Sequence, residues 1–430
     1  MRYYSLNHNS KDTSFKNAVI RGLAPDRGLY FPNQIPILSK KFFENIEHIS
    51  VPEMAFQIIK PYVGKEIDNK KLLSIVTETL DFEFPIVQIT DNIAAFELFH
   101  GPTLAFKDVG ARFMARALGH FSKSMEDNTT VLVATSGDTG GAVANGFLGV
   151  DGVEVIILYP KGKISEIQEK QITTLGQNIT ALEVDGVFDD CQEMVKAAFL
   201  DPSLTKMNLT SANSINVARW LPQMFYYFIA YRSLKNKNKK LVFSVPSGNF
   251  GNICAGVMAQ QMGLPIDHFI ASTNSNDSVP RYLKTGNFEP LQTIQTISNA
   301  MDVGNPSNFI RIQKIFNNDI FRMKKIISGY SYSDIETKKS LIEIYKKNGY
   351  IADPHGAVGF LGLKEYLSKQ NKDHYGVFLE TAHPVKFIDS VEKILKLKVQ
   401  IPNRLKSALS KKKSCIPIKD FSELKSYLLN

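Results

Sequence analysis

The sequence predicts an α/β protein with two lobes, each built on an open parallel β-sheet with helices on both faces. Three observations support this fold class. From Ile93 onward, short apolar runs alternate with amphipathic segments, which is the pattern of parallel strands joined by helices. The chain has 430 residues, of which 43% are hydrophobic, so it is long enough for two domains with substantial cores. A break in the pattern near residues 205–240 separates two groups of elements.

The predicted strands are short apolar runs bounded by turn residues. They are Ile93–Leu98, Thr130–Ala134, Glu154–Tyr159, Ile179–Val184, Lys240–Ser244, His268–Ser272 and Tyr375–Leu379. The predicted helices lie between the strands and carry apolar residues at helical spacing. They are Val109–His120, Gly141–Phe147, Ser165–Leu175, Phe188–Phe199, Trp220–Leu234, Gly251–Met262 and Ala357–Leu367.

We expect the chain to divide into three parts. Residues 1–95 mix turns with helical stretches and are predicted to form an N-terminal segment that packs on the large lobe. Residues 96–205 form the small lobe, which carries Lys107 and a glycine-rich loop. Residues 206–430 form the large lobe, which carries a second glycine-rich loop and Thr381.

The composition is that of a globular protein without a membrane segment. The start of the chain lacks the apolar core of a signal peptide, and no apolar run approaches the length that crosses a bilayer. The three cysteines, Cys191, Cys254 and Cys415, are far apart and fit no metal-ligand spacing. They are typical of reduced core residues. We therefore expect a cytoplasmic protein with no metal ion and no membrane partner.

The net charge of +9 raises the question of nucleic acid. The lysines are scattered, with small clusters at Lys235–Lys240 and Lys406–Lys413. Neither cluster is interleaved with aromatic residues, and no nucleic-acid fold signature is present. A solvated basic surface is therefore favoured over a nucleic-acid partner, and a positive field would also attract an anionic substrate.

The segment from Phe96 to Asp108 is the most informative in the chain. An apolar run ends at the turn Gly101-Pro102, and Lys107 follows at the start of a predicted helix. A lysine at a sheet edge is partly desolvated, which lowers its pKa and makes its amine nucleophilic. A Schiff-base lysine requires such an amine. The alternative is a helix start with an incidental surface cation.

Two strand-to-helix junctions are rich in glycine. One is the loop Thr135–Gly141, which contains Ser136, Asp138 and Thr139, and the other is Ser247–Asn252. Small residues let backbone N–H groups turn towards a ligand, and the following helix N-terminus favours an anion. The second loop has no acidic residue and suits a phosphate, whereas Asp138 suits a hydroxyl. Taken alone, each loop is equally explained as a tight turn.

Two further segments have polar side chains near the predicted ends of strands or helices. Thr381 follows the last predicted strand and so lies at the same sheet edge as the loops. The segment Asn213–Trp220 gathers amides and Arg219 at a helix start, where a guanidinium could bind a carboxylate or a phosphate. A helix cap with a hydrogen-bond cluster explains this segment equally well.

Together these elements are more specific than any one of them. A pinned lysine, a phosphate nest, an anion loop and a neutral hydroxyl at strand ends are what pyridoxal 5'-phosphate requires. The lysine forms the imine, the nest holds the phosphate, the anion loop takes an amino-acid carboxylate, and the hydroxyl meets the pyridine nitrogen.

The chain resembles the threonine synthase family, within the fold-type II pyridoxal-phosphate enzymes that share the fold of the tryptophan synthase β-subunit. The resemblance spans nearly the whole chain and is carried by several motifs. They are the block from Ser14 to Tyr30, HGPTLAFKD, TSGDTGGAVA, NSINVARW, PSGNFGN, the run Met301–Asn308, the run Asp353–Ala357 and TAHPVKF.

The resemblance implies roles for individual residues. It implies that Lys107 is the catalytic Schiff-base lysine and that Thr381 partners the pyridine nitrogen. The residues that it implies for the cofactor's phosphate are Gly248, Asn249, Phe250, Gly251 and Asn252. It places Asp138 near the cofactor's 3-hydroxyl. The residues that it implies for the substrate are Ser136, Thr139, Asn213, Asn216 and Arg219.

The resemblance also implies a reaction, the conversion of O-phospho-L-homoserine and water to L-threonine and phosphate in threonine biosynthesis. Another fold-type II lyase, such as a serine/threonine dehydratase or a phospho-amino-acid lyase, is the nearest alternative. A non-catalytic ligand-binding homologue is a second alternative, and the intact Lys107 argues against it. The sequence leaves the oligomeric state open between a monomer and a homodimer.

Overall fold

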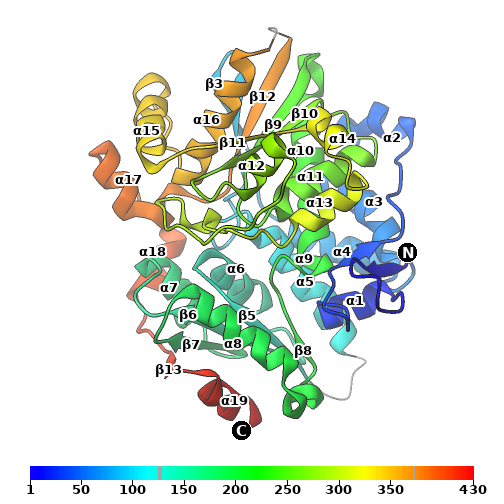
Figure 1. The fold of residues 1–430 in the computed structure, drawn as a ribbon, viewed down its shortest axis with the longest axis vertical. Helices are drawn as coiled ribbons and strands as arrows, with labels where there is room; N and C mark the ends of the chain where they lie inside the picture. Colours follow the sequence, from blue (N-terminus) through cyan, green and yellow to red (C-terminus); the bar gives the residue numbers. More distant parts are fainter. Residues whose placement is uncertain (124–127, 371–372) are drawn as a thin grey trace.

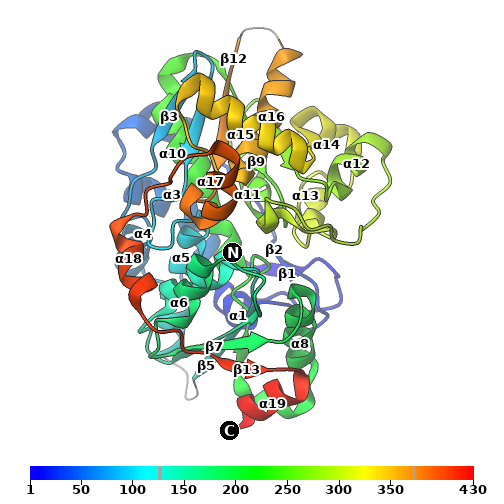
Figure 2. The same cartoon turned by 90° about the vertical axis from the view of Figure 1, so that its left-hand side faces the viewer.

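The computed structural model describes residues 1–123, 128–370 and 373–430, and it contains two separate parallel sheets. Figures 1 and 2 show the sheets one above the other, with the larger sheet in the upper half of both views. The strands are β1 (Tyr3–Ser5), β2 (Tyr30–Pro32), β3 (Ile86–Thr90), β4 (Ile93–Glu97), β5 (Thr129–Ala134), β6 (Val153–Pro160), β7 (Ile179–Val184), β8 (Leu209–Thr210), β9 (Lys240–Pro246), β10 (His268–Thr273), β11 (Ile327–Ser331), β12 (His374–Glu380) and β13 (Ile416–Ile418).

Helices surround both sheets. The α-helices are α1 (Phe15–Arg21), α2 (Lys40–Asn45), α3 (Val51–Val63), α4 (Asn69–Thr79), α5 (Lys107–Ser122), α6 (Asp138–Phe147), α7 (Glu166–Thr173), α8 (Phe188–Leu200), α9 (Val217–Trp220), α10 (Met224–Leu234), α11 (Gly251–Gln261), α12 (Ser278–Thr285), α13 (Phe309–Ile315), α14 (Ile320–Ile326), α15 (Asp334–Asn348), α16 (Pro354–Ser368), α17 (Ile388–Leu395), α18 (Asn403–Ser410) and α19 (Phe421–Leu429). Short 3-10 helices are η1 (Ile46–His48), η2 (Pro202–Met207), η3 (Leu221–Gln223), η4 (Lys235–Lys237), η5 (Asn299–Met301) and η6 (Pro384–Phe387).

The larger sheet has the strand order β11-β10-β9-β12-β4-β3, and all neighbouring pairs are parallel except β3 with β4. Every residue of β10 and β12 is buried, which explains why these strands are apolar runs without alternation. Helix α16 packs on β9, β10 and β12. The two mainly parallel, helix-covered sheets have the architecture of the predicted fold class.

The smaller sheet has the order β13-β7-β6-β5-β8 and is parallel throughout. This order corrects the predicted lobe boundaries. Strand β4, at residues 93–97, and its partner β3 belong to the larger sheet. Strand β13 belongs to the smaller sheet, although residues 206–430 were assigned to the large lobe. A three-residue strand has no detectable periodicity, so its place depends on pairing with β7 across a long stretch of chain.

The basic cluster near Lys413 helps to hold this C-terminal segment in place. The Lys413 ammonium pairs with Glu169 at 2.7 Å and also with Glu183 of β7. Beyond it, Leu424 and Leu428 of α19 pack in a hydrophobic cluster with residues of α8. The C-terminal segment therefore completes the small lobe, as both views show beside the C-terminus (Figures 1 and 2).

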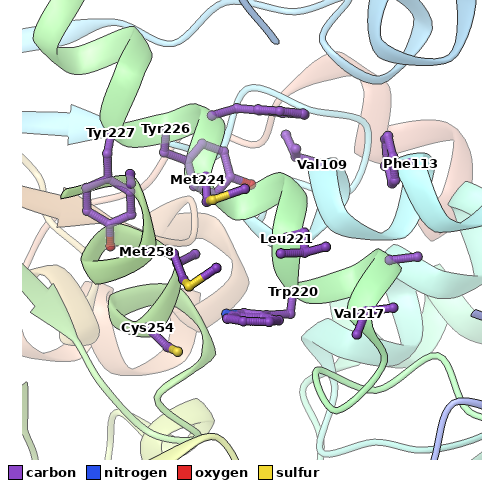
Figure 3. Packing of buried hydrophobic residues seen from close by; sticks show 14 of the residues in the cluster. Val109, Phe113, Val217, Trp220, Leu221, Met224, Tyr226, Tyr227, Cys254 and Met258 are labelled. Carbon is purple, nitrogen blue, oxygen red and sulfur yellow. The ribbon is translucent and has the colours of Figure 1, made fainter. Parts of the chain in front are cut away.

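One continuous hydrophobic core contains residues of both lobes. Figure 3 shows the cluster, whose labelled members are Val109, Phe113, Val217, Trp220, Leu221, Met224, Tyr226, Tyr227, Cys254 and Met258. The predicted helix Trp220–Leu234 is observed as the end of α9, then η3, then α10, with Pro222 in the 3-10 turn. Proline donates no backbone hydrogen bond, which fits an interruption there. In the described part of the chain, no helix is long and apolar enough to cross a membrane.

Candidate active site

A cavity of about 530 Å³ lies between the two lobes, where the carboxyl ends of strands from both sheets meet helix N-termini. The sequence-predicted residues that line it are Lys107, Ser136, Asp138, Thr139, Asn213, Arg219, Gly248, Asn249, Phe250, Gly251, Asn252 and Thr381. Asn216 is the one predicted residue that does not line it. The structure therefore brings together the four separate loops on which the cofactor prediction rested.

Lys107 is the first residue of α5, directly after the turn that follows β4. The turn is held by Asp108, whose carboxylate accepts hydrogen bonds from the Thr103 N–H at 2.9 Å and the Thr103 hydroxyl at 2.5 Å. The backbone N–H of Phe106 donates to the carbonyl of Thr381 at 2.8 Å. The turn therefore joins the start of α5 to the end of β12, and Lys107 and Thr381 line the same cavity.

Burial lowers the pKa of Lys107 to about 8. Within the described residues, its ammonium makes no hydrogen bond or ion pair, and it lies 5.9 Å from the centre of the Phe106 ring. A lysine with this pKa exchanges a proton near neutral pH, and its neutral amine has the free electron pair that nucleophilic attack requires.

The loop after β9 forms a cradle of backbone N–H groups at the start of α11. The N–H of Ser247 donates to the Ser272 carbonyl at 2.8 Å, and Phe250 adopts φ 60°. A Cβ atom at Gly248 would lie 2.7 Å from the Cα of Met301, so only glycine fits against the backbone at Met301. The buried Asn252 side chain has an unpartnered Nδ2 among the described residues. These features suit an anion at a helix N-terminus.

Asn249 ties the cradle to two other segments of the cavity wall. Its side-chain Nδ2 donates to the Ser214 hydroxyl at 3.1 Å, and its Oδ1 accepts from the Ser307 N–H at 2.6 Å. The Asn249 side chain therefore fixes the shape of the cradle.

The first glycine-rich loop is organised by Thr135, which the prediction did not single out. Its hydroxyl accepts hydrogen bonds from the N–H groups of Gly137 at 2.9 Å and Gly140 at 2.8 Å. Gly137 has φ 128°, a conformation that favours glycine. This turn starts α6 at Asp138.

Asp138 is buried and has two partners that the sequence did not reveal. The ammonium of Lys386 lies 2.8 Å from Asp138 Oδ1, and Gln168 Nε2 donates to the same oxygen at 2.9 Å. Burial acts to raise the pKa of Asp138, but Lys386 and Lys107 outweigh it and hold that pKa well below its ordinary value. Asp138 is therefore an anion at neutral pH.

Arg219 and Asn216 lie on or beside the short helix α9 but differ in their surroundings. Arg219 is buried in the cavity wall, and its Nε and one terminal nitrogen have no partner in the described part of the chain. Burial lowers the pKa of Arg219 to about 10, so it stays charged at neutral pH. A buried guanidinium with unpartnered nitrogens fits an anionic ligand. Asn216 instead caps α9, and its Nδ2 donates to the carbonyls of Val19 at 2.9 Å and Ser211 at 3.2 Å.

Sequence reasoning missed part of the wall. Asp302 and His355 line the cavity, in motifs that carried the resemblance but received no role. His355 contacts the buried Asp353 through Nδ1 at 2.5 Å, and its Nε2 accepts from the Ala300 N–H at 3.2 Å. Burial raises the pKa of Asp302 to about 6. No periodic pattern in the sequence predicts that these residues line the cavity. Their place in the family motifs was the only sequence signal that could have identified them.

The residues fit pyridoxal phosphate. The cradle around Gly248 suits a phosphate, Lys107 offers an amine, and the buried Thr381 offers a hydroxyl at the end of β12. Among the described residues, no group of three or more histidine, cysteine, aspartate or glutamate side chains could hold a metal ion. Residues 93–379 match the family model of the pyridoxal-phosphate dependent enzymes. With this fold and this site, the chain is a fold-type II pyridoxal-phosphate enzyme.

Residues 2–80 match the model of the threonine synthase N terminus, and residues 356–428 match that of the threonine synthase C-terminal region. The chain is 47% identical to the threonine synthase of Buchnera aphidicola from Baizongia pistaciae and 42% identical to that of Escherichia coli, each over the full length of both chains. The chain belongs to the threonine synthase family.

Solved structures agree with this assignment. The E. coli threonine synthase crystal structure superposes with a TM-score of 0.93 at 41% identity and covers both chains completely. A pyridoxal-phosphate-bound threonine synthase from Brucella melitensis superposes with a TM-score of 0.94 at 34% identity, over all of this chain and 98% of that one. The predicted family, fold class, cofactor and enzyme activity are confirmed.

Proposed function

We propose that the residues of this cavity convert O-phospho-L-homoserine and water to L-threonine and phosphate, with Lys107 as the central base. The observation that carries the proposal is a buried lysine amine in the same cavity as a glycine cradle that suits an anion. The full-length similarity to threonine synthases supports this substrate over those of other fold-type II enzymes.

Pyridoxal phosphate supplies an electron sink that stabilises negative charge at the substrate α-carbon. The backbone N–H groups from Gly248 to Asn252 would hold its phosphate at the start of α11. Thr381 would offer the pyridine nitrogen a neutral hydroxyl, and Asp138 would interact with the 3-hydroxyl group. A hydroxyl partner does not hold a protonated pyridine as a carboxylate would, so charge stays closer to the reacting carbon and elimination is favoured.

The substrate carries two anionic groups, and the cavity has matching donors. Ser136 and Thr139 flank the N-terminus of α6 and suit the carboxylate. Arg219 has unpartnered guanidinium nitrogens and, with Asn213 in the same cavity wall, suits an anionic oxygen of the substrate. We assign Asn216 a positioning role, because its amide is used in capping the helix that carries Arg219.

Lys107 moves the protons. Its Nζ removes the substrate α-proton and later returns a proton to the same carbon. A pKa near 8 lets one amine act as base and acid at neutral pH.

The test is Lys107→Ala, compared with Lys398→Ala, whose side chain is 92% exposed. Threonine formation from O-phospho-L-homoserine is expected to fall by more than about 10³-fold in Lys107→Ala, with an unchanged circular dichroism spectrum. Lys398→Ala is expected to retain full activity. Formation of 2-oxobutyrate in place of threonine by the unaltered protein would instead indicate a dehydratase.

A second readout locates the covalent link. Borohydride reduction of the cofactor-loaded protein, followed by peptide mass mapping, is expected to find the cofactor on Lys107. Attachment to another lysine, including the buried Lys386, would contradict the assignment.

We further propose that the enzyme acts in the cytoplasm as a monomer or a homodimer, without a nucleic-acid partner. The scattered arrangement of its basic residues supports the last point. Light scattering is expected to give a mass near 48.2 kDa or twice that value. A larger assembly, or salt-dependent binding to DNA, would contradict this proposal.

A further inference from the structure

The active site contains a second buried lysine. Lys386 lies in η6, which follows β12 of the larger sheet, and its side chain is fully buried. Its ammonium pairs with Asp138 Oδ1 at 2.8 Å and donates to the carbonyl of Thr103 at 3.0 Å. One cation thus joins the end of the large sheet, the turn before Lys107 and the first residue of α6 in the small lobe.

The other side of Asp138 is held by the small lobe. Gln168 donates to Asp138 Oδ1 at 2.9 Å, and a capping box with Ser165 fixes Gln168 at the start of α7. The Ser165 N–H donates to Gln168 Oε1 at 3.1 Å. A Cβ atom at Gly137 would lie 2.4 Å from the Gln168 side chain, so the loop is closely packed against it. The carboxylate is therefore clamped between a lysine of the large lobe and an amide of the small lobe.

The charges around Lys107 make this clamp important. Asp138 favours the protonated form of Lys107, whereas Lys386 and Arg219 oppose it. The carboxylate of Asp108, the residue after Lys107, is bound by the N–H and hydroxyl of Thr103. Without Lys386, Asp138 would be a buried anion whose closest remaining cation is the amine that must accept a proton.

We propose that Lys386 is a positioning residue that holds Asp138 in a neutral pair across the two lobes and thereby keeps the Lys107 amine available as a base. This inference rests on the proposed role of Lys107. It predicts that Lys386 acts through its charge, because a neutral side chain of similar length would fill the same space but leave Asp138 free to pair with Lys107.

The test measures how readily Lys107 reacts in the cofactor-free, full-length protein as the pH is changed. Trace labelling with acetic anhydride, followed by mass spectrometry of the Lys107 peptide, gives the pH midpoint of amine reactivity. In Lys386→Met and Lys386→Gln the midpoint is expected to rise by about one pH unit or more. In Lys386→Arg, which keeps the charge, it is expected to stay near the wild-type value.

A double variant separates charge from packing. Lys386→Gln combined with Asp138→Asn removes both members of the ion pair and leaves two neutral side chains of similar shape. Its midpoint is expected to return to the wild-type value or below it. An unchanged midpoint in natively folded Lys386→Gln, or a midpoint raised equally in the double variant, would overturn the proposal.

Two provisions keep the test decisive. If Lys386→Met and Lys386→Gln do not fold, Lys386→Arg and the double variant can still be measured. A raised pH midpoint of Lys107 reactivity in either of these two proteins would refute the inference. The readout is also independent of turnover: a protein whose Lys107 midpoint shifts as expected but which forms no threonine would contradict the proposed function and leave the role of Lys386 standing.

Discussion

The guanidinium carbon of Arg311 lies 4.3 Å from the centre of the Trp220 ring, deep inside the protein. Its terminal nitrogens donate to Asn308 Oδ1 at 2.6 Å and to the carbonyls of Ile215 at 2.6 Å and Tyr30 at 3.0 Å. This one side chain therefore joins the N-terminal segment, the segment before Arg219 and the wall beside the phosphate cradle.

We predict that Arg311→Lys lowers the free energy of unfolding by about 3 kcal/mol, because a lysine cannot reach these acceptors together and leaves buried carbonyls unsatisfied. Urea unfolding measures the change. The matched control is Arg281→Lys, whose partly exposed pair with Asp277 is expected to contribute less than about 1 kcal/mol. Equal effects of the two changes would refute the structural role of Arg311.

We predict that Arg219→Gln raises KM for O-phospho-L-homoserine by about 10- to 100-fold, with a smaller effect on kcat. The lost interaction is a charge-assisted hydrogen bond with an anionic group that is present throughout the reaction. Steady-state kinetics measures both constants. An unchanged KM would show that the unpartnered nitrogens of Arg219 do not face the substrate.

We predict that Gly248→Ala weakens the binding of pyridoxal phosphate by at least about tenfold. The new methyl group would meet the backbone of Met301 at 2.7 Å, so the cradle or the neighbouring turn must shift. Titration of the cofactor-free protein, followed by absorbance, gives the dissociation constant. Gly349→Ala, with φ 66° and no neighbouring atom within 4 Å, is the control for strain away from the cavity. Its cofactor affinity is expected to match that of the wild type.

We predict that stability falls as the pH drops from about 6.5 to about 4, in part because of His268. Burial lowers the pKa of His268 from 6.5 to about 4, and its ring bonds Ser328 at 2.8 Å. The unfolded chain therefore binds a proton in this range before the folded chain does, which costs about 2–3 kcal/mol of stability. Urea unfolding at a series of pH values across this range measures the free energy of unfolding. This free energy should change less with pH in His268→Gln than in the wild type. The exposed His48, changed to Gln, is the control and should leave the slope unchanged.

Much of the fold was predictable because its central strands are buried on both faces. Ile179–Val184 is observed with the predicted bounds as β7, and His268–Ser272 is one residue short of β10. Helix α5 begins two residues before the predicted Val109, which makes Lys107 its first residue. Helix ends depend on caps and on neighbouring segments, so periodicity alone does not locate them to the residue.

The site residues could be predicted where the residues next to them in the sequence form a pattern that is typical of a binding or reactive site. Glycine-rich turns before helices and a lysine after a Gly-Pro turn are local patterns, and the loops that carry them meet at one sheet edge in any parallel α/β lobe. Asn216 had a similar local setting, and only its bonds to Val19 and Ser211 distinguish a helix cap from a cavity residue.

The sequence by itself determined the fold class and the cofactor, because buried strands and short motifs of neighbouring residues carry each of these predictions. The tertiary structure alone decided that Lys386 neutralises Asp138, that His355 supports the cavity wall and that β13 completes the small sheet. Each of these depends on the approach of segments far apart in the sequence. Such contacts arise from packing and the pairing of buried charges, and no periodicity or spacing along the chain records them.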